Sequence, residues 1–166
     1  MHFILLTHSR ELSKQTATGP LVKQALENQC DIIEWSRTIP DSRLTTELDT
    51  SKTLLIYPDT HSPELVIKDT KALIEFDTFI ILDGTWQEAK KMYNRSPYLH
   101  SLAHYQLEVN YLSSYQLRRN QKSIGLCTAE VAIELLKQKS ELAQASKLED
   151  LYNKFNSGIK VEEKTN

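Results

Sequence analysis

The strongest constraint on the fold of this chain is the repeated occurrence of short apolar runs that end in polar residues. The clearest runs are at 3–7, 53–57 and 78–82. Apolar runs of this length predict strands that are buried on both faces, which are typical of parallel sheets. Segments of helical composition lie between the runs, and this alternation is the pattern of an α/β protein. We therefore predict a single α/β domain with a mostly parallel sheet and helices on both faces.

The remaining segments extend the same alternation along the chain. Pro20 follows Gly19, and proline is favoured in the first turn of a helix, so a helix is predicted to begin here. The last residues are charged, so we expect a domain over residues 1–156 and a disordered tail over 157–166. The other predicted elements are strands at 31–35 and 106–109 and helices at 86–94, 127–137 and 142–155. Residues 61–76 have a mixed pattern that allows a helix.

The distribution of charge along the chain says more about function than its sum. The 166 residues carry a formal net charge of -2, which argues against a strongly basic, non-specific nucleic-acid coat. Residues 1–85 and 130–166 carry net charges of -5 and -1, whereas residues 86–129 carry +4. If the cations of the middle segment converge in the fold, they form a local anion site on an otherwise acidic body.

The cysteines and the N-terminus argue against several classes of protein. Cys30 and Cys127 are the two cysteines of the chain, and their spacing fits neither a disulfide framework nor a zinc site. The first residues are apolar over too short a stretch for a signal peptide and lack its basic region. No apolar run approaches the ~20 residues needed to cross a bilayer. We therefore expect a cytoplasmic protein with no metal and no membrane association.

Polar clusters follow three of the predicted strands, at 8–18, 57–60 and 83–86. Ligands of open α/β sheets bind at the carboxyl ends of strands, so these clusters form the candidate site. The sharpest cluster is Asp83-Gly84-Thr85-Trp86, in which glycine allows a tight turn or the close approach of a ligand. The same residues are also compatible with a plain turn, in which Asp83 caps the next helix and Trp86 packs in the core.

The segment that begins at Asp83 resembles a known motif. Residues 83–92, Asp-Gly-Thr-Trp-Gln-Glu-Ala-Lys-Lys-Met, are similar to the defining motif of the DTW-domain family. Further similarities follow in the family's order over roughly residues 1–140. They are His8-Ser9-Arg10-Glu11 with Thr16-Ala17-Thr18-Gly19, Tyr57-Pro58, Ser96-Pro97-Tyr98-Leu99, Leu117-Arg118-Arg119 and Gly125-Leu126-Cys127-Thr128-Ala129-Glu130. The sequence departs from the family in lacking an N-terminal cysteine cluster and in having Ala17 and Val131 where asparagine and alanine are expected.

The resemblance implies a specific activity. The DTW family includes tRNA-uridine aminocarboxypropyltransferases, which transfer the 3-amino-3-carboxypropyl group of S-adenosylmethionine to N3 of a uridine and release 5'-methylthioadenosine. It therefore implies tRNA as the partner and S-adenosylmethionine as the donor, without a metal. It also implies a fold related to the SPOUT class, with a knotted C-terminal part that holds the donor. The sequence indicates no obligate protein partner.

The chemistry of this transfer suggests roles for the residues of the motif. The donor carbon is activated by the adjacent sulfonium, whereas uridine N3 carries a proton at neutral pH, so the enzyme must remove that proton and align the two atoms. Asp83 is the candidate base, or it orients the uracil through a hydrogen bond. Trp86 is a candidate platform for base stacking, or a core residue. Thr85 either contacts a ligand or caps the helix.

Further site residues are assigned from the resemblance together with their chemistry. Arg10 is expected to contact the donor carboxylate or a phosphate through its guanidinium, or to pair with Glu11. The predicted donor-binding residues are Tyr57, Pro58, Asp83, Gly84, Ser123, Leu126 and Thr128, of which Thr128 is equally compatible with a helix N-cap. The predicted RNA- or anion-binding residues are Arg10, Thr18, Gly19, Lys90, Arg118, Arg119 and Lys122.

Two other functions fit the same residues. A SPOUT-type RNA methyltransferase would bind the same donor but transfer its methyl group. A non-catalytic RNA-binding domain would use the basic residues alone. The presence of both Asp83 and Trp86 favours an enzyme, and the near-neutral total charge argues against a protein that only binds RNA.

Overall fold

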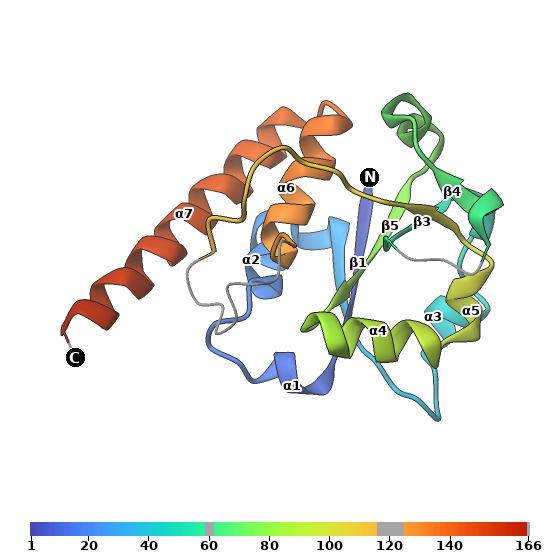
Figure 1. Ribbon diagram of the computed structural model, residues 1–166, viewed down its shortest axis with the longest axis horizontal. Helices are drawn as coiled ribbons and strands as arrows, with labels where there is room; N and C mark the ends of the chain where they lie inside the picture. Colours follow the sequence, from blue (N-terminus) through green and yellow to red (C-terminus); the bar gives the residue numbers. More distant parts are fainter. Residues whose placement is uncertain (59–61, 116–124, 166) are drawn as a thin grey trace. The chain divides into compact units, whose positions relative to one another are not determined.

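The computed structural model describes residues 1–58, 62–115 and 125–165 (Figure 1). The chain forms two compact units, each built from two segments. The first, here called the sheet unit, comprises residues 1–17 and 28–108. The second, the helical unit, comprises residues 18–27 and 109–166. All strands of the sheet belong to the first unit, and the longest helices belong to the second.

The sheet of the described residues has six strands, and every neighbouring pair is parallel. This arrangement confirms the predicted α/β class and the parallel sheet. The strand order is β2-β1-β5-β3-β6-β4, so β5 lies between β1 and β3 at the centre. The strands are β1 His2–Thr7, β2 Cys30–Glu34, β3 Thr53–Ile56, β4 Val66–Ile67, β5 Thr78–Asp83 and β6 Ala103–Tyr105.

Two of the predicted elements are wrong, both toward one edge of the sheet. The strand expected at 106–109 lies instead at Ala103–Tyr105, where the polar His104 interrupts the apolar pattern that would have revealed it. The helix considered at 61–76 is replaced by two 3₁₀ turns that flank the two-residue strand β4. A strand this short has no periodicity to detect, since it is set by its pairing with β6.

One face of the sheet packs against the helices α3 (Ser42–Thr45), α4 (Trp86–Asn94) and α5 (Pro97–His100). The strands contribute alternate residues to this core, while the residues between them are buried on the opposite face, as the continuous apolar runs predicted. Burial of each large side chain contributes ~1.5–3 kcal/mol to stability. The core includes Ile4, Leu6, Leu44, Leu55, Ile80, Leu82, Ala89, Met92, Leu99 and Leu102.

A buried polar pair lies within this core. The Tyr93 hydroxyl donates to Nε2 of His104 at 2.9 Å, and His104 Nδ1 donates to the carbonyl oxygen of Leu102 at 2.7 Å. The carbonyl can only accept, so Nδ1 carries the proton and the neutral ring accepts at Nε2. His104 has no exposed surface, and this burial is the main cause that lowers its pKa below the usual range.

The depressed pKa of His104 makes stability depend on pH. As the pH falls below about 6.5, the unfolded chain binds a proton that the buried ring does not, so the free energy of unfolding decreases. We expect urea unfolding to show a smaller loss of stability between about pH 7.5 and about pH 5.5 for His104→Gln than for the wild type. Equal losses in the two proteins would show that His104 does not contribute to the acid sensitivity.

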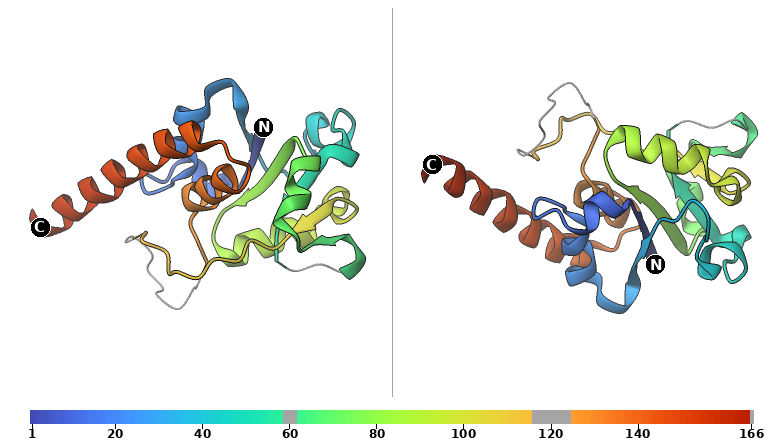
Figure 2. Two further views of the ribbon diagram at one scale, coloured as in Figure 1. Left: turned by 90° about the horizontal axis from the view of Figure 1, so that it is seen from above. Right: turned by 90° about the horizontal axis from the view of Figure 1, so that it is seen from below.

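The helical unit consists of α2 (Gly19–Leu26), α6 (Thr128–Gln138) and α7 (Leu142–Thr165), which pack against one another. Figures 1 and 2 show α7 as one continuous helix. It extends through Thr165 and therefore includes most of the segment 157–166 for which a disordered tail was expected. The buried side chains of this unit include Val22 and Leu26 from α2, Ile133, Leu135 and Leu136 from α6, and Leu148 and Tyr152 from α7.

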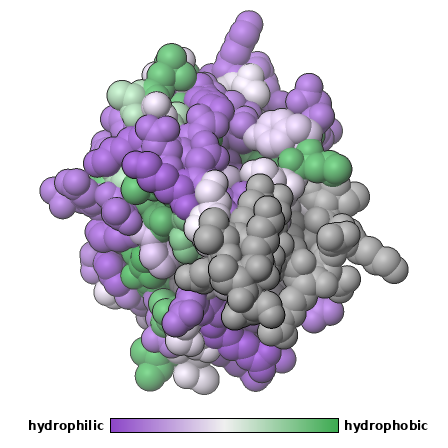
Figure 3. Space-filling view, turned by 90° about the vertical axis from the view of Figure 1, so that its left-hand side faces the viewer, coloured by the Kyte–Doolittle hydropathy of each residue, from purple (hydrophilic) through white to green (hydrophobic). Residues whose placement is uncertain are grey.

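One face of the molecule carries mainly polar side chains among its described residues. In Figure 3 the coloured part of this face is mostly hydrophilic, and the apolar side chains form small separate groups. Across the described ranges, no helix combines the length and apolar character needed to cross a membrane.

Candidate functional site

The carboxyl ends of β1 and β5 form the centre of the candidate site. After β1 the chain continues to β2, which lies toward one edge of the sheet. After β5 it continues to β6, which lies toward the opposite edge. Such a reversal of direction is the topological switch point at which open α/β sheets bind ligands. Thr7 and Asp83 are paired in register as the last residues of these two strands. The polar clusters predicted after the strands therefore lie at the edge where a ligand is expected.

Asp83 is held by β1 and does not cap a helix. Its carboxylate accepts a hydrogen bond from the Thr7 hydroxyl at 3.2 Å, and its carbonyl oxygen accepts one from the His8 amide at 2.9 Å. The side chain is buried, with 5% of its surface exposed. Because residues alternate along a strand, Asp83 faces the same side as Phe79 and Ile81, opposite the core that contains α4. The structure thus excludes the reading in which Asp83 is the helix cap.

Thr85 is the residue that caps α4. Its hydroxyl accepts from the Glu88 amide at 3.2 Å, and the Glu88 carboxylate accepts from the Thr85 amide at 2.9 Å. This is a capping box, which satisfies two amides at the start of the helix. The capping alternative considered for Thr85 is therefore correct, and its direct contact with a ligand remains a prediction.

Gly84 allows the chain to pass close to Glu88. A Cβ atom at this position would lie 2.9 Å from Glu88 Oε2, which is closer than Cβ atoms approach in proteins, and 3.1 Å from Glu88 Cβ, which is a tight contact. It would also lie 3.5 Å from the Cβ atom of His8. The glycine thus has a packing role at the strand-to-helix turn, in addition to the donor contact predicted for it.

Replacing this glycine tests the turn. We expect Gly84→Ala to lower stability by about 0.5–2 kcal/mol, because the new methyl group displaces the carboxylate of the capping box. Gly158→Ala is the matched control: nothing lies within 4 Å of its added Cβ, and alanine is favoured within α7. The control variant is expected to gain up to ~1 kcal/mol in urea unfolding. A Gly84→Ala protein as stable as the wild type would contradict the tight turn.

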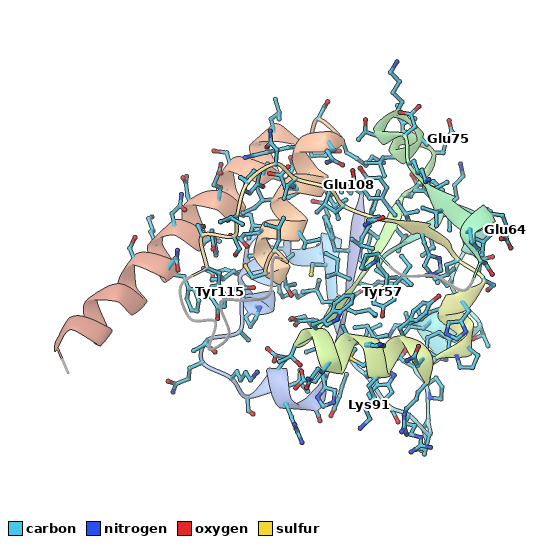
Figure 4. The ribbon with its side chains drawn as sticks, in the orientation of Figure 1. Tyr57, Glu64, Glu75, Lys91, Glu108 and Tyr115 are labelled. Atoms are coloured by element: carbon cyan, nitrogen blue, oxygen red, sulfur yellow. The ribbon has the colours of Figure 1, made fainter. Side chains whose placement is uncertain are left out.

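Trp86 is exposed, and one face of its ring packs against a buried tyrosine. It has 54% of its surface exposed, which excludes the core position considered for it. Its ring stacks on Tyr57 with centroids 5.9 Å apart and planes at 18°, and Tyr57 stacks on Tyr93 at 4.3 Å and 23°. Figure 4 shows Tyr57 beside the first turn of α4. We call Trp86, Tyr57 and Tyr93 the aromatic column.

The aromatic column includes one of the two donor-binding residues predicted at the end of β3, Tyr57 and Pro58. Tyr57 is buried beneath Trp86, so its ring supports the site from within, whereas the neighbouring Pro58 is exposed at the end of the strand. Asp83 faces one side of the sheet, whereas Trp86 stacks on Tyr57, which belongs to the core on the α4 side.

A second aromatic pair lies at the ends of β1 and β2. His8 Nδ1 accepts from the Arg10 amide at 3.2 Å and so caps α1 (Ser9–Leu12). The His8 ring stacks with Trp35 at 6.0 Å, and Trp35 Nε1 donates to the Ser96 hydroxyl at 2.8 Å. Neither Trp35 nor Ser96 was predicted from the sequence to belong to the site. A tryptophan at the end of a predicted strand was the available signal for Trp35.

Arg10 is exposed at the same edge. Glu11, the partner considered for it, pairs instead with Lys14 at 2.5 Å. Among the residues that the structure describes, Arg10 has no carboxylate within ion-pairing distance. Its predicted role in binding an anion is compatible with this position.

Four predicted residues of the helical unit are less exposed than expected for ligand contacts. Thr18 is buried, and its hydroxyl accepts from the Ala129 amide at 3.1 Å, which joins α2 to the start of α6. Gly19 is likewise buried as the first residue of α2. Leu126 and Thr128 are half-buried, and the N-cap of α6 is Cys127, not Thr128. Four further predicted residues lie outside the described ranges: Arg118, Arg119, Lys122 and Ser123.

Glu130 organises the polar interior of the helical unit. Its carboxylate accepts from the Ser113 hydroxyl at 2.6 Å, from the amides of Ser114 and Cys127 at 2.8 Å, and from the Tyr152 hydroxyl at 3.0 Å. Burial alone raises the pKa of Glu130, but these hydrogen bonds outweigh it and leave the pKa below its usual range. The charged carboxylate also raises the pKa of the buried Cys127 thiol, which burial has already increased, to about 12. From the sequence, Glu130 was singled out only as part of the segment 125–130 that resembles the family.

Removing the negative charge of Glu130 should destabilise the protein. Glu130→Gln is expected to destabilise the protein by about 1–3 kcal/mol, because an amide NH₂ group would face donors that now bind a carboxylate. Glu149→Gln is the control on a neighbouring helix, where it breaks only the exposed pair with Lys137 and should change stability by less than about 0.5 kcal/mol. Urea unfolding of both variants measures the difference, and similar values for the two would contradict the role of Glu130.

The fold and this edge define a class of protein: a parallel α/β domain with a carboxylate and an exposed tryptophan at the switch point of its sheet. The chain belongs to the DTW family, because the DTW domain model matches residues 1–160. It is 30% identical over 148 residues to a tRNA-uridine aminocarboxypropyltransferase 2 of Drosophila melanogaster. The aligned residues cover 85% of this chain and 58% of that protein.

Other relatives carry the same name. A Macaca fascicularis protein is 26% identical over 149 residues, covering 86% of this chain and 50% of that protein. A Mus musculus protein is 26% identical over 134 residues, covering 79% and 45%. The chain therefore spans about half the length of the curated relatives it matches. No solved structure matches it. The described residues contain no group of three or more histidine, cysteine or acidic side chains placed to hold a metal ion.

Proposed function

We propose that this domain transfers the 3-amino-3-carboxypropyl group of S-adenosylmethionine to N3 of a uridine in tRNA and releases 5'-methylthioadenosine. The observation that carries the proposal is the position of Asp83, a buried carboxylate at the switch point of the sheet, within the motif of this family. The names of the relatives support the choice of tRNA uridine and of this group.

The reaction needs a proton acceptor and alignment. The N3–C bond forms as the C–S bond breaks, and the electron pair of that bond converts the sulfonium into a neutral thioether. The N3 proton passes to the Asp83 carboxylate. A positioned base contributes ~10²–10⁴-fold to rate, and alignment of the two reactants contributes more, on the order of 7–11 kcal/mol in ideal cases.

The surroundings of Asp83 suit this role. The Thr7 hydroxyl holds one carboxylate oxygen at 3.2 Å, which restricts the rotation of the side chain. A carboxylate also complements the positive charge of the sulfonium donor. The donor-binding residues predicted from the sequence stay a prediction: Tyr57, Pro58, Asp83, Gly84, Ser123, Leu126 and Thr128. The SPOUT relationship, the knotted C-terminal part and a cytoplasmic location remain predictions from the sequence.

Asp83→Asn tests the proposed base. The amide retains an oxygen for the Thr7 hydroxyl but cannot take the proton, so transfer should fall by at least about 10²-fold while the fold is preserved. The assay uses unmodified tRNA and S-adenosylmethionine labelled at either the carboxyl carbon or the methyl group. Asp150→Asn, on the exposed side of α7, is the control and should retain full activity.

The two labels separate the possible reactions. Carboxyl label in the RNA together with released methylthioadenosine supports the proposal. Methyl label in the RNA would identify a methyltransferase, and no transfer of either label would contradict an enzyme of this type acting on tRNA. Wild-type turnover by a folded Asp83→Asn protein would remove Asp83 from the mechanism.

A further inference from the structure

We propose that the solvent face of α4 is a docking surface for the phosphates of an unpaired RNA segment, one base of which stacks on Trp86. The surface, here called the α4 track, consists of Trp86, Lys90, Lys91 and Arg95. The choice of RNA as ligand rests on the proposed function, but the docking itself is measured by binding and does not depend on which group is transferred.

The arrangement of the track follows from the helix. Trp86, Lys90, Lys91 and Arg95 are all exposed, whereas Ala89, Met92 and Tyr93 on the other side pack in the core. Trp86 and Lys90 lie one turn apart, as do Lys91 and Arg95, which corresponds to about 6 Å along the axis. Figure 4 shows Lys91 and Tyr57 on opposite sides of α4. With 3.6 residues per turn, Lys90 lies about 40° around the helix axis from Trp86, and Lys91 and Arg95 lie about 140° and about 180° from it. The track therefore winds across the exposed half of α4, from the ring to the side away from Tyr57.

The described residues place no acidic partner beside the cations of the track. Within the described ranges, Lys90, Lys91 and Arg95 have no carboxylate within ion-pairing distance, whereas Lys14, Arg43 and Lys137 each pair with one. Glu88, the acidic residue of α4, is engaged in the capping box.

Nearby cations repel one another, so their accumulation on one helix is unfavourable unless an anion binds there. The helix dipole favours the two cations near the C-terminus but not Lys90 in the middle. The preceding residues 1–85 carry a net charge of -5, which makes this positive surface a local exception.

The exposed ring indicates the kind of RNA. In a duplex each base is covered by its neighbours and offers no face to a side chain, whereas unpaired bases stack on aromatic residues. One side of Trp86 is supported by Tyr57, and 54% of its surface is exposed. An aromatic ring followed by unpaired cations is the pattern by which proteins bind single strands. We therefore infer that the track holds a loop or other unpaired segment around the target uridine.

The first experiment compares two variants of equal charge. Lys90→Gln/Lys91→Gln/Arg95→Gln removes the cations of the track, and Lys52→Gln/Lys68→Gln/Lys71→Gln removes three exposed cations elsewhere in the sheet unit. We expect the first to weaken binding of unmodified tRNA by at least about 10-fold at moderate salt and to reduce the slope of log K against log salt by ~2. The second should change both by much less. Equal effects of the two variants would overturn the proposal, because bulk charge alone would then explain them.

The second experiment follows stacking through tryptophan fluorescence. Oligouridylate should quench the emission of the wild type but not that of Trp86→Phe, in which Trp35 is the remaining tryptophan. A blunt RNA duplex of similar length should quench little. Equal quenching by the duplex, or unchanged quenching in Trp86→Phe, would overturn the inference of an unpaired segment.

Binding and transfer distinguish this proposal from the proposed function. Docking on the α4 track without transfer of label would retain the track and contradict the reaction. Transfer with an unchanged KM for tRNA in the triple α4 variant would retain the reaction and contradict the track.

Discussion

The pairing of β1 with β5 is the constraint on which the candidate site depends. Six residue pairs join these strands, and the last pair brings Thr7 opposite Asp83 although the two residues are 76 positions apart in the sequence. A slip of one residue would turn Asp83 to the other face of the sheet and remove its bond with the Thr7 hydroxyl. The carboxylate is therefore placed by backbone hydrogen bonds between central strands, which are among the most stable parts of a domain.

The start of α4 places an exposed aromatic ring directly after the end of β5. The capping box between Thr85 and Glu88 begins the helix directly after Gly84, and Trp86 then lies over Tyr57. Beneath Tyr57, Tyr93 is fixed by its hydrogen bond to His104. An exposed ring is thus held by buried ones, and this support lowers the entropy that a stacked ligand would otherwise have to overcome.

In both units the buried polar groups have hydrogen-bond partners. In the helical unit, Glu130 satisfies donors from the segment that contains Ser113 and from α6 and α7. In the sheet unit, His104 and Trp35 each find a partner. Among the described residues, no buried side-chain nitrogen or oxygen lacks one. The exposed cations of α4 differ from these groups, because the described residues give them no carboxylate partner.

The sequence by itself determined the α/β class, the three apolar strands and the DTW family, because apolar runs and a contiguous motif are local properties of the chain. It did not reveal β4 or β6, since β4 has only two residues and β6 contains the polar His104. It left open whether Asp83 caps a helix and whether Trp86 is buried.

Only the tertiary structure decided those questions. The strand order places β5 between β1 and β3, and this pairing makes Asp83 a strand residue held by Thr7. The packing of α4 leaves Trp86 exposed above Tyr57, and the hydrogen bonds of Glu130 come from segments that are distant in the sequence. The physical reason is that strand pairing, stacking and burial are contacts between remote residues, which no local pattern of side chains specifies.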